Sequence, residues 1–294
     1  MKYRSNVLER SATMLIYTFL ITLALLCVAP LVHILAVSFS AAWAAEGGDV
    51  LFWPVDFTIQ SYEFVFTKPQ FLQSIGITLQ RVILGVALSM LLTVMAAYPL
   101  SKEKSFFRFR TVYAWIFVFT ILFSGGLIPW YMTIRATGLL DSIWALVLPG
   151  AVPVFNIIIL LNFFRGLPKE LEESAFVDGA QHWTILFKIF IPLSKPALAT
   201  LTLFSVVGHW NSWFDGLILM NSPEHYPLSS YLQTVVIGRD FSQMTAQEVM
   251  RLSQISDRTF KSAQIFVGAL PVLLLYPFLQ KYFAKGIVLG SVKG

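Results

Sequence analysis

The sequence is poor in charged residues. Only 13% of its 294 residues are Asp, Glu, Lys or Arg, whereas 56% are hydrophobic and 15% are aromatic. A typical soluble domain carries about 25% charged residues, so this chain has too few polar groups to cover a water-soluble body of its size. The composition therefore excludes a soluble enzyme, a disordered chain and a soluble nucleic-acid-binding domain.

Residues and motifs that support catalysis or metal binding are also missing. Cys27 is the single cysteine, so the chain can form neither an intrachain disulfide nor a cysteine-based metal site. The sequence has no P-loop, no H-E-x-x-H and no G-x-S-x-G motif. Its histidines are too scattered for a metal cluster. We therefore predict no metal, no catalytic residue and no cofactor in this chain. The four histidines are His33, His182, His209 and His225.

The few charges are separated by long uncharged stretches. Six stretches without Asp, Glu, Lys or Arg are at least 19 residues long, and the next longest has 14. A helix needs about 20 apolar residues to cross a bilayer. The pattern predicts an all-α integral membrane protein with six transmembrane helices. The predicted spans are residues 13–38, 76–100, 112–134, 143–164, 194–219 and 262–280.

The distribution of Lys and Arg indicates an orientation. Threading the six spans in order places 14 Lys or Arg on the side of the termini and seven on the other side. By the positive-inside rule, both termini are cytoplasmic. The first apolar run has 35 residues, against about 7–15 in a signal peptide, so we expect an uncleaved first helix. Residues 1–294 are predicted to form one domain with outer loops 39–73 and 220–261.

Glycine and proline interrupt the third and fourth predicted spans. They can mark broken helices that line a pathway, but glycine and proline are also common in ordinary membrane helices. The strongest candidate for local unwinding is Ser124-Gly125-Gly126, because Pro129 follows within the next turn. Both interpretations of the other glycines and prolines stay open.

Ionisable residues within the spans are few. They are His33, His209 and, near the outer ends, Arg81 and Asp215. A proton- or sodium-coupled carrier usually needs intramembrane carboxylates and repeated halves, and neither pattern is evident in the sequence. We infer that the driving force comes from another protein.

The predicted cytoplasmic segment 166–192 reads as two short helices with a joint. Pro168 suits the first turn of a helix, and Gly179 suits a helix end and close backbone approach. A second amphipathic helix is predicted for residues 181–190, ending before Pro192. Such a loop can present a compact helix to another protein.

The same segment resembles the coupling loop of ABC-importer permeases. The matching residues are Glu173-Ser174-Ala175, then Gly179 after three residues, then Ile189-Phe190-Ile191-Pro192 after nine more. Ser174 and Ile191 replace the family's Ala and Leu. Further similar stretches relate the chain to carbohydrate-uptake permeases of the maltose importer type, and it looks closest to permeases for complex oligosaccharides such as the alginate importer. These stretches are 125–129, 138–149, 192–200, 210–213 and 285–294.

This resemblance implies a type I ABC importer permease fold in the bacterial cytoplasmic (inner) membrane. Its implied partners are a second homologous permease, a dimer of ATP-binding subunits that holds ATP and Mg, an extracytoplasmic solute-binding protein, an oligosaccharide and membrane lipid, but no nucleic acid. The mechanism would be alternating access. The residues implied in ATPase coupling are Glu173, Ser174, Ala175, Asp178, Gly179, Ala180 and Pro192.

Aromatic rings and amides are the side chains that usually bind sugars. Trp and Tyr also anchor helices at membrane interfaces, and Asn can join helices, so this assignment has an ordinary alternative. For an acidic sugar, Arg135 and Arg239 are the outer candidate cations. A permease for another solute, a channel and a membrane-embedded enzyme are the alternative functions. The predicted pathway residues are Trp210, Asn211, Trp213, Trp130, Tyr131 and Asn156.

Overall fold

The computed structural model describes residues 7–237 and 256–291, and these residues form helices and connecting loops without any strand. The predicted all-α class is confirmed. The chain divides into two compact units. Unit 1 comprises Met1–Pro69 and Thr234–Leu270, and unit 2 comprises Gln70–Gln233 and Pro271–Gly294. Each unit contains its own hydrophobic core.

Unit 1 begins with α1 (Val7–Ser38), followed by two short helices, α2 (Ala42–Gly47) and α3 (Gln60–Thr67). The side chains of residues 14–28 in α1 are exposed although all but Thr18 and Thr22 are apolar or aromatic, as expected of a helix that meets lipid or another subunit. The last turns of α1 pack on α2 in a small core. The N-terminal part of α16 (Asp257–Ser291) also belongs to unit 1. Residues 238–255 of the predicted outer loop, including Arg239, lie outside the described residues.

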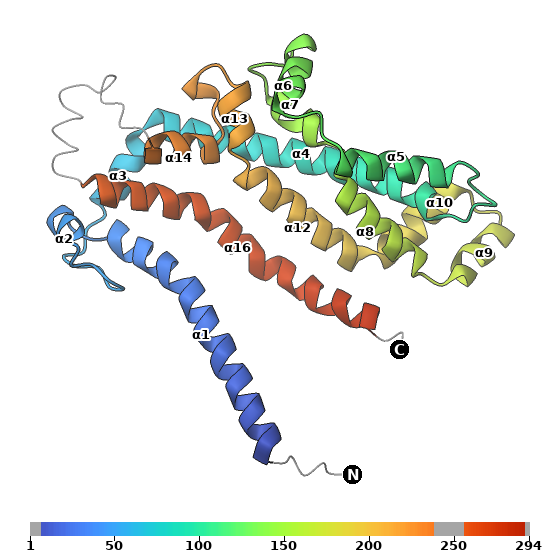
Figure 1. The fold of residues 1–294 in the computed structure, drawn as a ribbon, viewed down its shortest axis with the longest axis horizontal. Coiled ribbons are helices and arrows are strands. Elements are labelled where there is room, and N and C mark those ends of the chain that lie inside the picture. Colours follow the sequence, from blue (N-terminus) through green and yellow to red (C-terminus); the bar gives the residue numbers. More distant parts are fainter. Residues whose placement is uncertain (1–6, 238–255, 292–294) are drawn as a thin grey trace. The chain divides into compact units, whose positions relative to one another are not determined.

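Unit 2 is built on α4 (Pro69–Ser101), a single helix of 33 residues (Figure 1). Small and polar residues recur on its buried face every three or four positions, which lets neighbouring backbones approach closely. The C-terminal end of α4 shares a core with α8 (Val154–Arg165) and α12 (Lys195–Asn211). The buried stripe consists of Ser74, Thr78, Arg81, Gly85, Ser89, Thr93 and Ala97.

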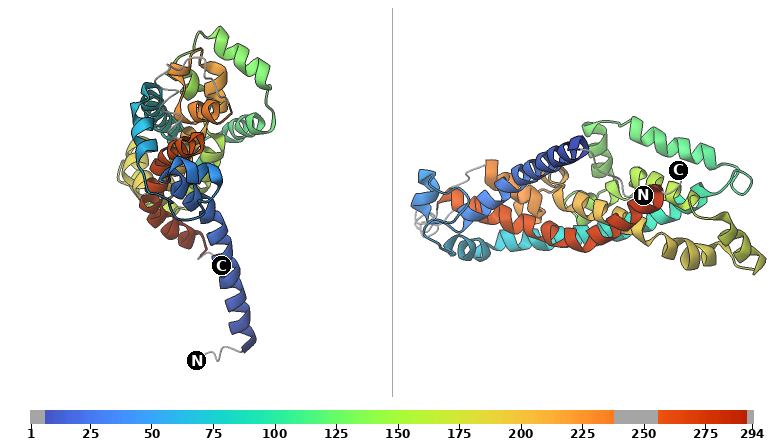
Figure 2. Two further views of the ribbon diagram at one scale, coloured as in Figure 1. Left: turned by 90° about the vertical axis from the view of Figure 1, so that its left-hand side faces the viewer. Right: turned by 90° about the horizontal axis from the view of Figure 1, so that it is seen from below.

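The third and fourth predicted spans are broken, as their glycine and proline content suggested. The third consists of α5 (Arg110–Leu122) and α6 (Leu127–Ala136), whose axes differ by 113°. The break includes Ser124-Gly125-Gly126, so the predicted unwinding there is confirmed. The fourth consists of α7 (Ile143–Val147), the 3-10 turn η1 (Leu148–Gly150) and α8, with a bend of 45°. No side chain of α5 is buried, and α5 lies at the edge of unit 2 in both views of Figure 2.

The predicted helix end before Pro192 is wrong. After α9 (Lys169–Val177), helical backbone runs through α10 (His182–Ile185), the π-helical turn η2 (Leu186–Phe190) and α11 (Ile191–Leu193). Pro192 directly follows the π-helical turn η2 and Ile191, so it lies inside a run of helical backbone and has no N–H to donate to the preceding turn. The chain bends by 81° between Leu193 and Lys195 instead.

The predicted fifth span also differs, because α12 ends at Asn211 and a separate short helix, α13 (Phe214–Leu219), follows. Beyond it lie the 3-10 turn η3 (Pro223–His225) and α14 (Leu228–Ile237). A second core of unit 2 joins α6, α7 and α13.

Three described helices are long and apolar enough to cross a membrane, and three bent pairs pass the same test together. The predicted six spans equal the upper count, in which each bent pair is one span. The single helices are Glu9–Ser38, Pro69–Ser101 and Asp257–Leu275.

Candidate functional site

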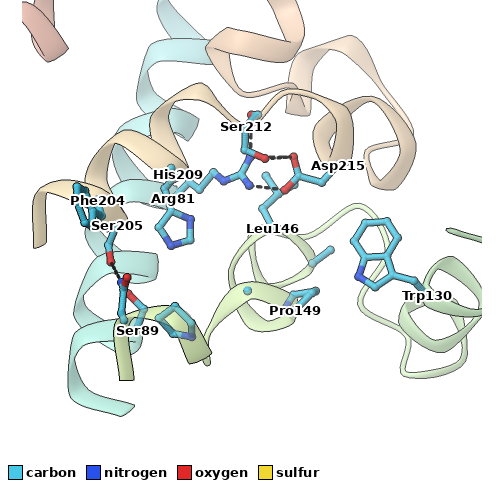
Figure 3. A pocket seen from close by; sticks show the side chains of 15 residues that line it. Arg81, Ser89, Trp130, Leu146, Pro149, Phe204, Ser205, His209, Ser212 and Asp215 are labelled. Atoms are coloured by element: carbon cyan, nitrogen blue, oxygen red, sulfur yellow. Dashed lines mark hydrogen bonds and ion pairs between the residues drawn. The ribbon is translucent and has the colours of Figure 1, made fainter. Parts of the chain in front are cut away.

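A polar cavity of about 450 Å³ lies within unit 2 (Figure 3). Its walls come from α4, α6, α7, η1, the start of α8, α12 and the break between α12 and α13. The volume falls in the range of about 300–1,000 Å³ found for small-molecule sites. The lining residues are Arg81, Ser89, Trp130, Ala145, Leu146, Pro149, Gly150, Pro153, Asn156, Phe204, Ser205, Gly208, His209, Ser212 and Asp215.

An ion pair between Arg81 and Asp215 closes one side of this cavity. Nη1 of Arg81 donates to Asp215 Oδ1 at 3.2 Å and to the carbonyl oxygen of Ser212 at 3.1 Å, while Nη2 donates to Asp215 Oδ2. The side chain of Arg81 is 3% exposed and that of Asp215 is 18% exposed. The fork of Arg thus matches the two carboxylate oxygens. Nε of Arg81 is buried and has no hydrogen-bond partner among the described residues.

The local sequence explains why the two charges meet. Arg81 lies on the buried stripe of α4, and the break after Asn211 brings the first turn of α13 toward it. Asp215 suits that first turn because of the helix dipole. Its Oδ1 also accepts hydrogen bonds from Ser212 Oγ at 2.8 Å and from the Gly216 amide at 2.9 Å. The carboxylate is therefore held from both sides.

Five further polar side chains line the cavity among apolar ones. The His209 ring lies so close to α4 that a Cβ atom added at Gly85 would be 2.5 Å from its Nε2 and Cε1 atoms. Nδ2 of Asn156 donates to Ser205 Oγ at 3.3 Å. Such groups can both donate and accept hydrogen bonds.

The structure brings only part of the predicted pathway set to this cavity. Trp130 and Asn156 line it, whereas Tyr131, Asn211 and Trp213 do not. Trp210 is 5% exposed and lies in the packed interior.

The residues that sequence reasoning missed are Arg81, Asp215, His209, Ser205 and Ser212. The first three had been recognised as rare ionisable residues within the spans, and that rarity was the available signal.

The predicted coupling segment forms α9 followed by a helix-ending turn at Gly179. Gly179 has φ +80°, and its amide donates to the Phe176 carbonyl at 3.0 Å, while the Ala180 amide donates to Ala175 at 2.9 Å. This is the Schellman pattern, which favours glycine. No described residue of this chain lies within 4 Å of a Cβ atom built at Gly179, so a close backbone approach there stays a prediction for a partner subunit.

The coupling residues divide into an inner and an outer set. Ala175 is buried, and both it and Ala180 pack on the core of unit 2. The exposed set is Glu173, Ser174, Asp178, Gly179 and Pro192.

A buried ion pair joins α9 to the end of α4. Nζ of Lys102 lies 2.5 Å from Glu172 Oε1, and their side chains are 8% and 22% exposed. The same ammonium lies 4.0 Å from the ring centre of Tyr98 and 4.1 Å from that of Phe190, in the range of cation–π attraction. Burial lowers the pKa of Lys102, although Glu172 opposes this shift.

A second, exposed ion pair joins the same two segments. Lys169 pairs with Glu103, and their side chains are 71% and 59% exposed. The hydrogen bond and the charge of Lys169 lower the pKa of Glu103, and Glu103 in turn raises the pKa of Lys169. Nη2 of Arg165 donates to the Leu100 carbonyl at 3.0 Å. The coupling segment is thus fastened to the C-terminal end of α4 at several points.

These apolar helices, with a polar cavity and a surface loop, define a membrane transport subunit. The chain belongs to the family described as "Binding-protein-dependent transport system inner membrane component", whose model matches residues 2–289. It is a permease subunit of a sugar or oligosaccharide ABC importer and not an enzyme.

Two curated relatives come from Bacillus subtilis (strain 168). The chain is 41% identical to the "Polygalacturonan/rhamnogalacturonan transport system permease protein YtcP", over 97% of this chain and 99% of that protein. It is 40% identical to "Protein LplC", over 90% of this chain and 89% of that protein.

A solved structure shares the fold. It is the crystal structure of a bacterial ABC transporter involved in the import of the acidic polysaccharide alginate, with a TM-score of 0.87 and 33% identity. The similarity covers 95% of this chain and 98% of that chain. The predicted type I ABC importer permease fold is confirmed.

Proposed function

We propose that this permease moves an oligosaccharide derived from an acidic polysaccharide across the bacterial inner membrane by alternating access. It works with a second permease, a dimer of ATP-binding subunits that holds ATP and Mg, and a solute-binding protein outside the membrane. The acidic substrate class is supported by the polygalacturonan/rhamnogalacturonan and alginate transporters to which the chain is similar.

The observation that carries the mechanism is the continuity of α4. Arg81 at the cavity and Lys102 at the coupling segment are 21 residues apart, and α4 is unbroken up to Ser101. At 1.5 Å per residue, they are separated by about 30 Å along one axis. A displacement of the coupling segment therefore reaches the cavity wall through a single rigid element.

The coupling segment serves as the contact with the ATP-binding subunit. Glu173, Ser174, Asp178 and Gly179 are exposed and free to meet it. Ala175 and Ala180 anchor the segment on unit 2. When ATP brings its two subunits together, α9 and α4 move with them and the cavity changes its access. For this to occur, ATP and the solute-binding protein must each bind the two access states of the importer with different free energies.

The coupling role is tested by two substitutions at one position. Gly179→Asp adds a charge to the exposed turn, and we expect a membrane-inserted protein whose transport is uncoupled from ATP hydrolysis. Gly179→Asn is the matched control, because Asn also adopts positive φ but adds no charge. Uptake and ATPase activity are measured together in proteoliposomes. Unchanged substrate-stimulated uptake in Gly179→Asp would refute the coupling role.

The substrate class is tested on the reconstituted importer. The solute-binding protein is loaded with matched neutral or uronate oligosaccharides, and the stimulation of ATP hydrolysis is measured for each. We expect the uronate series to give the greater stimulation. Equal or greater stimulation by the neutral series would refute the acidic class, and no stimulation by either series would refute an oligosaccharide substrate.

A further inference from the structure

The cavity in unit 2 carries no net formal charge. Arg81 and Asp215 are its only lining residues with a formal charge at neutral pH, and they pair with each other. The other ionisable lining residue is His209. Among the described residues that line the cavity, no cation besides Arg81 faces it, and the charge of Arg81 is already balanced.

The uncharged lining groups suit hydroxyls better than carboxylates. Five residues offer uncharged polar groups. The hydroxyls of Ser89 and Ser212 already donate to the Val86 carbonyl and to Asp215, so they can only accept from a ligand, and a carboxylate has no proton to donate to them. Trp130 and Phe204 add aromatic surface on opposite sides of the cavity (Figure 3). A sugar ring presents hydroxyls at its edge and C–H groups on its faces, and both find partners here. The five residues are Ser89, Asn156, Ser205, His209 and Ser212.

We propose that this cavity binds one ring of the transported saccharide through its hydroxyl groups and does not distinguish a neutral sugar from a uronate. The inference rests on the proposed import of an oligosaccharide and assigns this chain a ring-binding subsite. The choice between acidic and neutral substrates is then made outside the cavity. The Arg81–Asp215 pair keeps the subsite neutral.

This neutrality can be removed in either direction. Asp215→Asn leaves Arg81 as an unbalanced cation, while the Asn oxygen still accepts from Ser212 and Gly216. Arg81→Gln leaves Asp215 as an unbalanced anion. The double variant Arg81→Gln with Asp215→Asn keeps a hydrogen-bonded pair and restores zero charge, so it is the matched control.

The test measures equilibrium dissociation constants of the detergent-solubilised importer for a neutral and a uronate trisaccharide of the same linkage. The importer contains both permeases and the ATP-binding dimer, so any contribution of the second permease is common to all variants. Relative to the wild type, Asp215→Asn should favour the uronate about tenfold and Arg81→Gln should disfavour it about tenfold, because a charge at close range acts on the carboxylate. The double variant should return to the wild-type ratio.

Three results would overturn the proposal. One is an unchanged ratio of the two constants in both single variants, which leaves the pair a purely structural role. Another is a shift of the same sign in both. The third is a double variant that loses affinity for the uronate but not for the neutral sugar, because Arg81 would then read the carboxylate directly. If one single variant fails to assemble, the other still tests the sign of the shift, and the double variant still tests whether Arg81 reads the carboxylate directly.

Failure of the proposed function has a different signature. In that case the wild-type importer itself shows no ATPase stimulation by any loaded oligosaccharide. A wild type that is stimulated, combined with ratios that do not move as described, refutes only the neutral subsite.

Discussion

Two ion pairs of different physical character hold α4, one at Arg81 within the helix (here the cavity end) and one at Lys102, directly after Ser101 (here the coupling end). At the cavity, Arg81 and Asp215 form a fork with two hydrogen bonds in fixed directions. At the coupling segment, Lys102 places a single ammonium beside Glu172 and against the rings of Tyr98 and Phe190. A guanidinium fork fixes orientation, whereas an ammonium is a point charge on a flexible stem.

The difference indicates how each end responds to motion. The Lys102 contact tolerates rotation of α4, because a point charge over aromatic rings has no required direction. The Arg81 contact does not tolerate rotation, since both hydrogen bonds weaken when the two planes separate. We expect the coupling end to remain fastened throughout the transport cycle and the cavity end to open and close.

The largest expected effect is at the coupling end. Lys102→Met keeps most of the apolar stem but leaves Glu172 without its partner, and removing one partner of a largely buried pair costs about 3 kcal/mol. Thermal unfolding of the solubilised importer should show a lower Tm, and ATP-driven uptake should fall. Saccharide affinity at the cavity should remain near the wild-type value.

The exposed pair provides the matched control, because Lys169 and Glu103 join the same two segments. Lys169→Met should leave Tm and uptake close to those of the wild type, since exposed ion pairs contribute little. Equal losses in the Lys102 and Lys169 variants would contradict the importance assigned to burial.

A smaller effect is expected at the cavity end. Gly85→Ala places a methyl group against the His209 ring, and relieving this overlap should cost about 1–2 kcal/mol and weaken saccharide binding. Gly76→Ala is the control on the same helix, because its added Cβ meets nothing within 4 Å. It should stabilise by about 0.5–1 kcal/mol through helix propensity. The same sign for both changes in Tm would contradict the close approach at Gly85.

The smallest expected effect concerns the hydrogen bonds of Asp141, which lie outside α4. Asp141 accepts hydrogen bonds from the Asn221 amide and from His225 Nδ1. Burial raises its pKa, but these two bonds and the charge of His225 outweigh burial, so the pKa falls below 3.8. The resulting stabilisation is present above the unfolded-state pKa and is lost as pH falls through the lower folded-state value.

The contribution of the Asp141 hydrogen bonds to stability can be measured from the dependence of Tm on pH. Between about pH 5 and about pH 3, the wild type should lose stability relative to Asp141→Asn, because only the wild type has this carboxyl to protonate. Parallel Tm curves over this range would contradict the assignment. Saccharide affinity and ATP-driven uptake of Asp141→Asn should equal those of the wild type at neutral pH.

The sequence predicted the continuous apolar helices because a segment that crosses lipid must satisfy its own backbone polar groups. The charge-free run of residues 82–101 accordingly lies entirely within α4. The break at Ser124-Gly125-Gly126 was equally accessible, since weak helix formers were concentrated there. The continuation through Pro192 was not, because a π-helical turn arises from packing of η2 rather than from propensity.

The cavity was only partly predictable for a related reason. Trp210 and Trp130 look equivalent in sequence, and only the packing of α12 decides that the first is buried and the second lines the cavity. Arg81 and Asp215 were conspicuous individually, but 134 positions separate them. Pairing them requires the tertiary fold. Sequence patterns therefore identify unusual residues more reliably than their partners.

The interruption between α5 and α6 restricts what can surround this subunit. Helical backbone stops at Leu122 and resumes at Leu127, and α5 with its 13 residues is about 20 Å long, shorter than the roughly 30 Å hydrocarbon core. Irregular backbone at membrane depth is tolerated only where protein or water meets its polar groups. The polar backbone groups of this break therefore need water or a neighbouring protein rather than lipid as their partner.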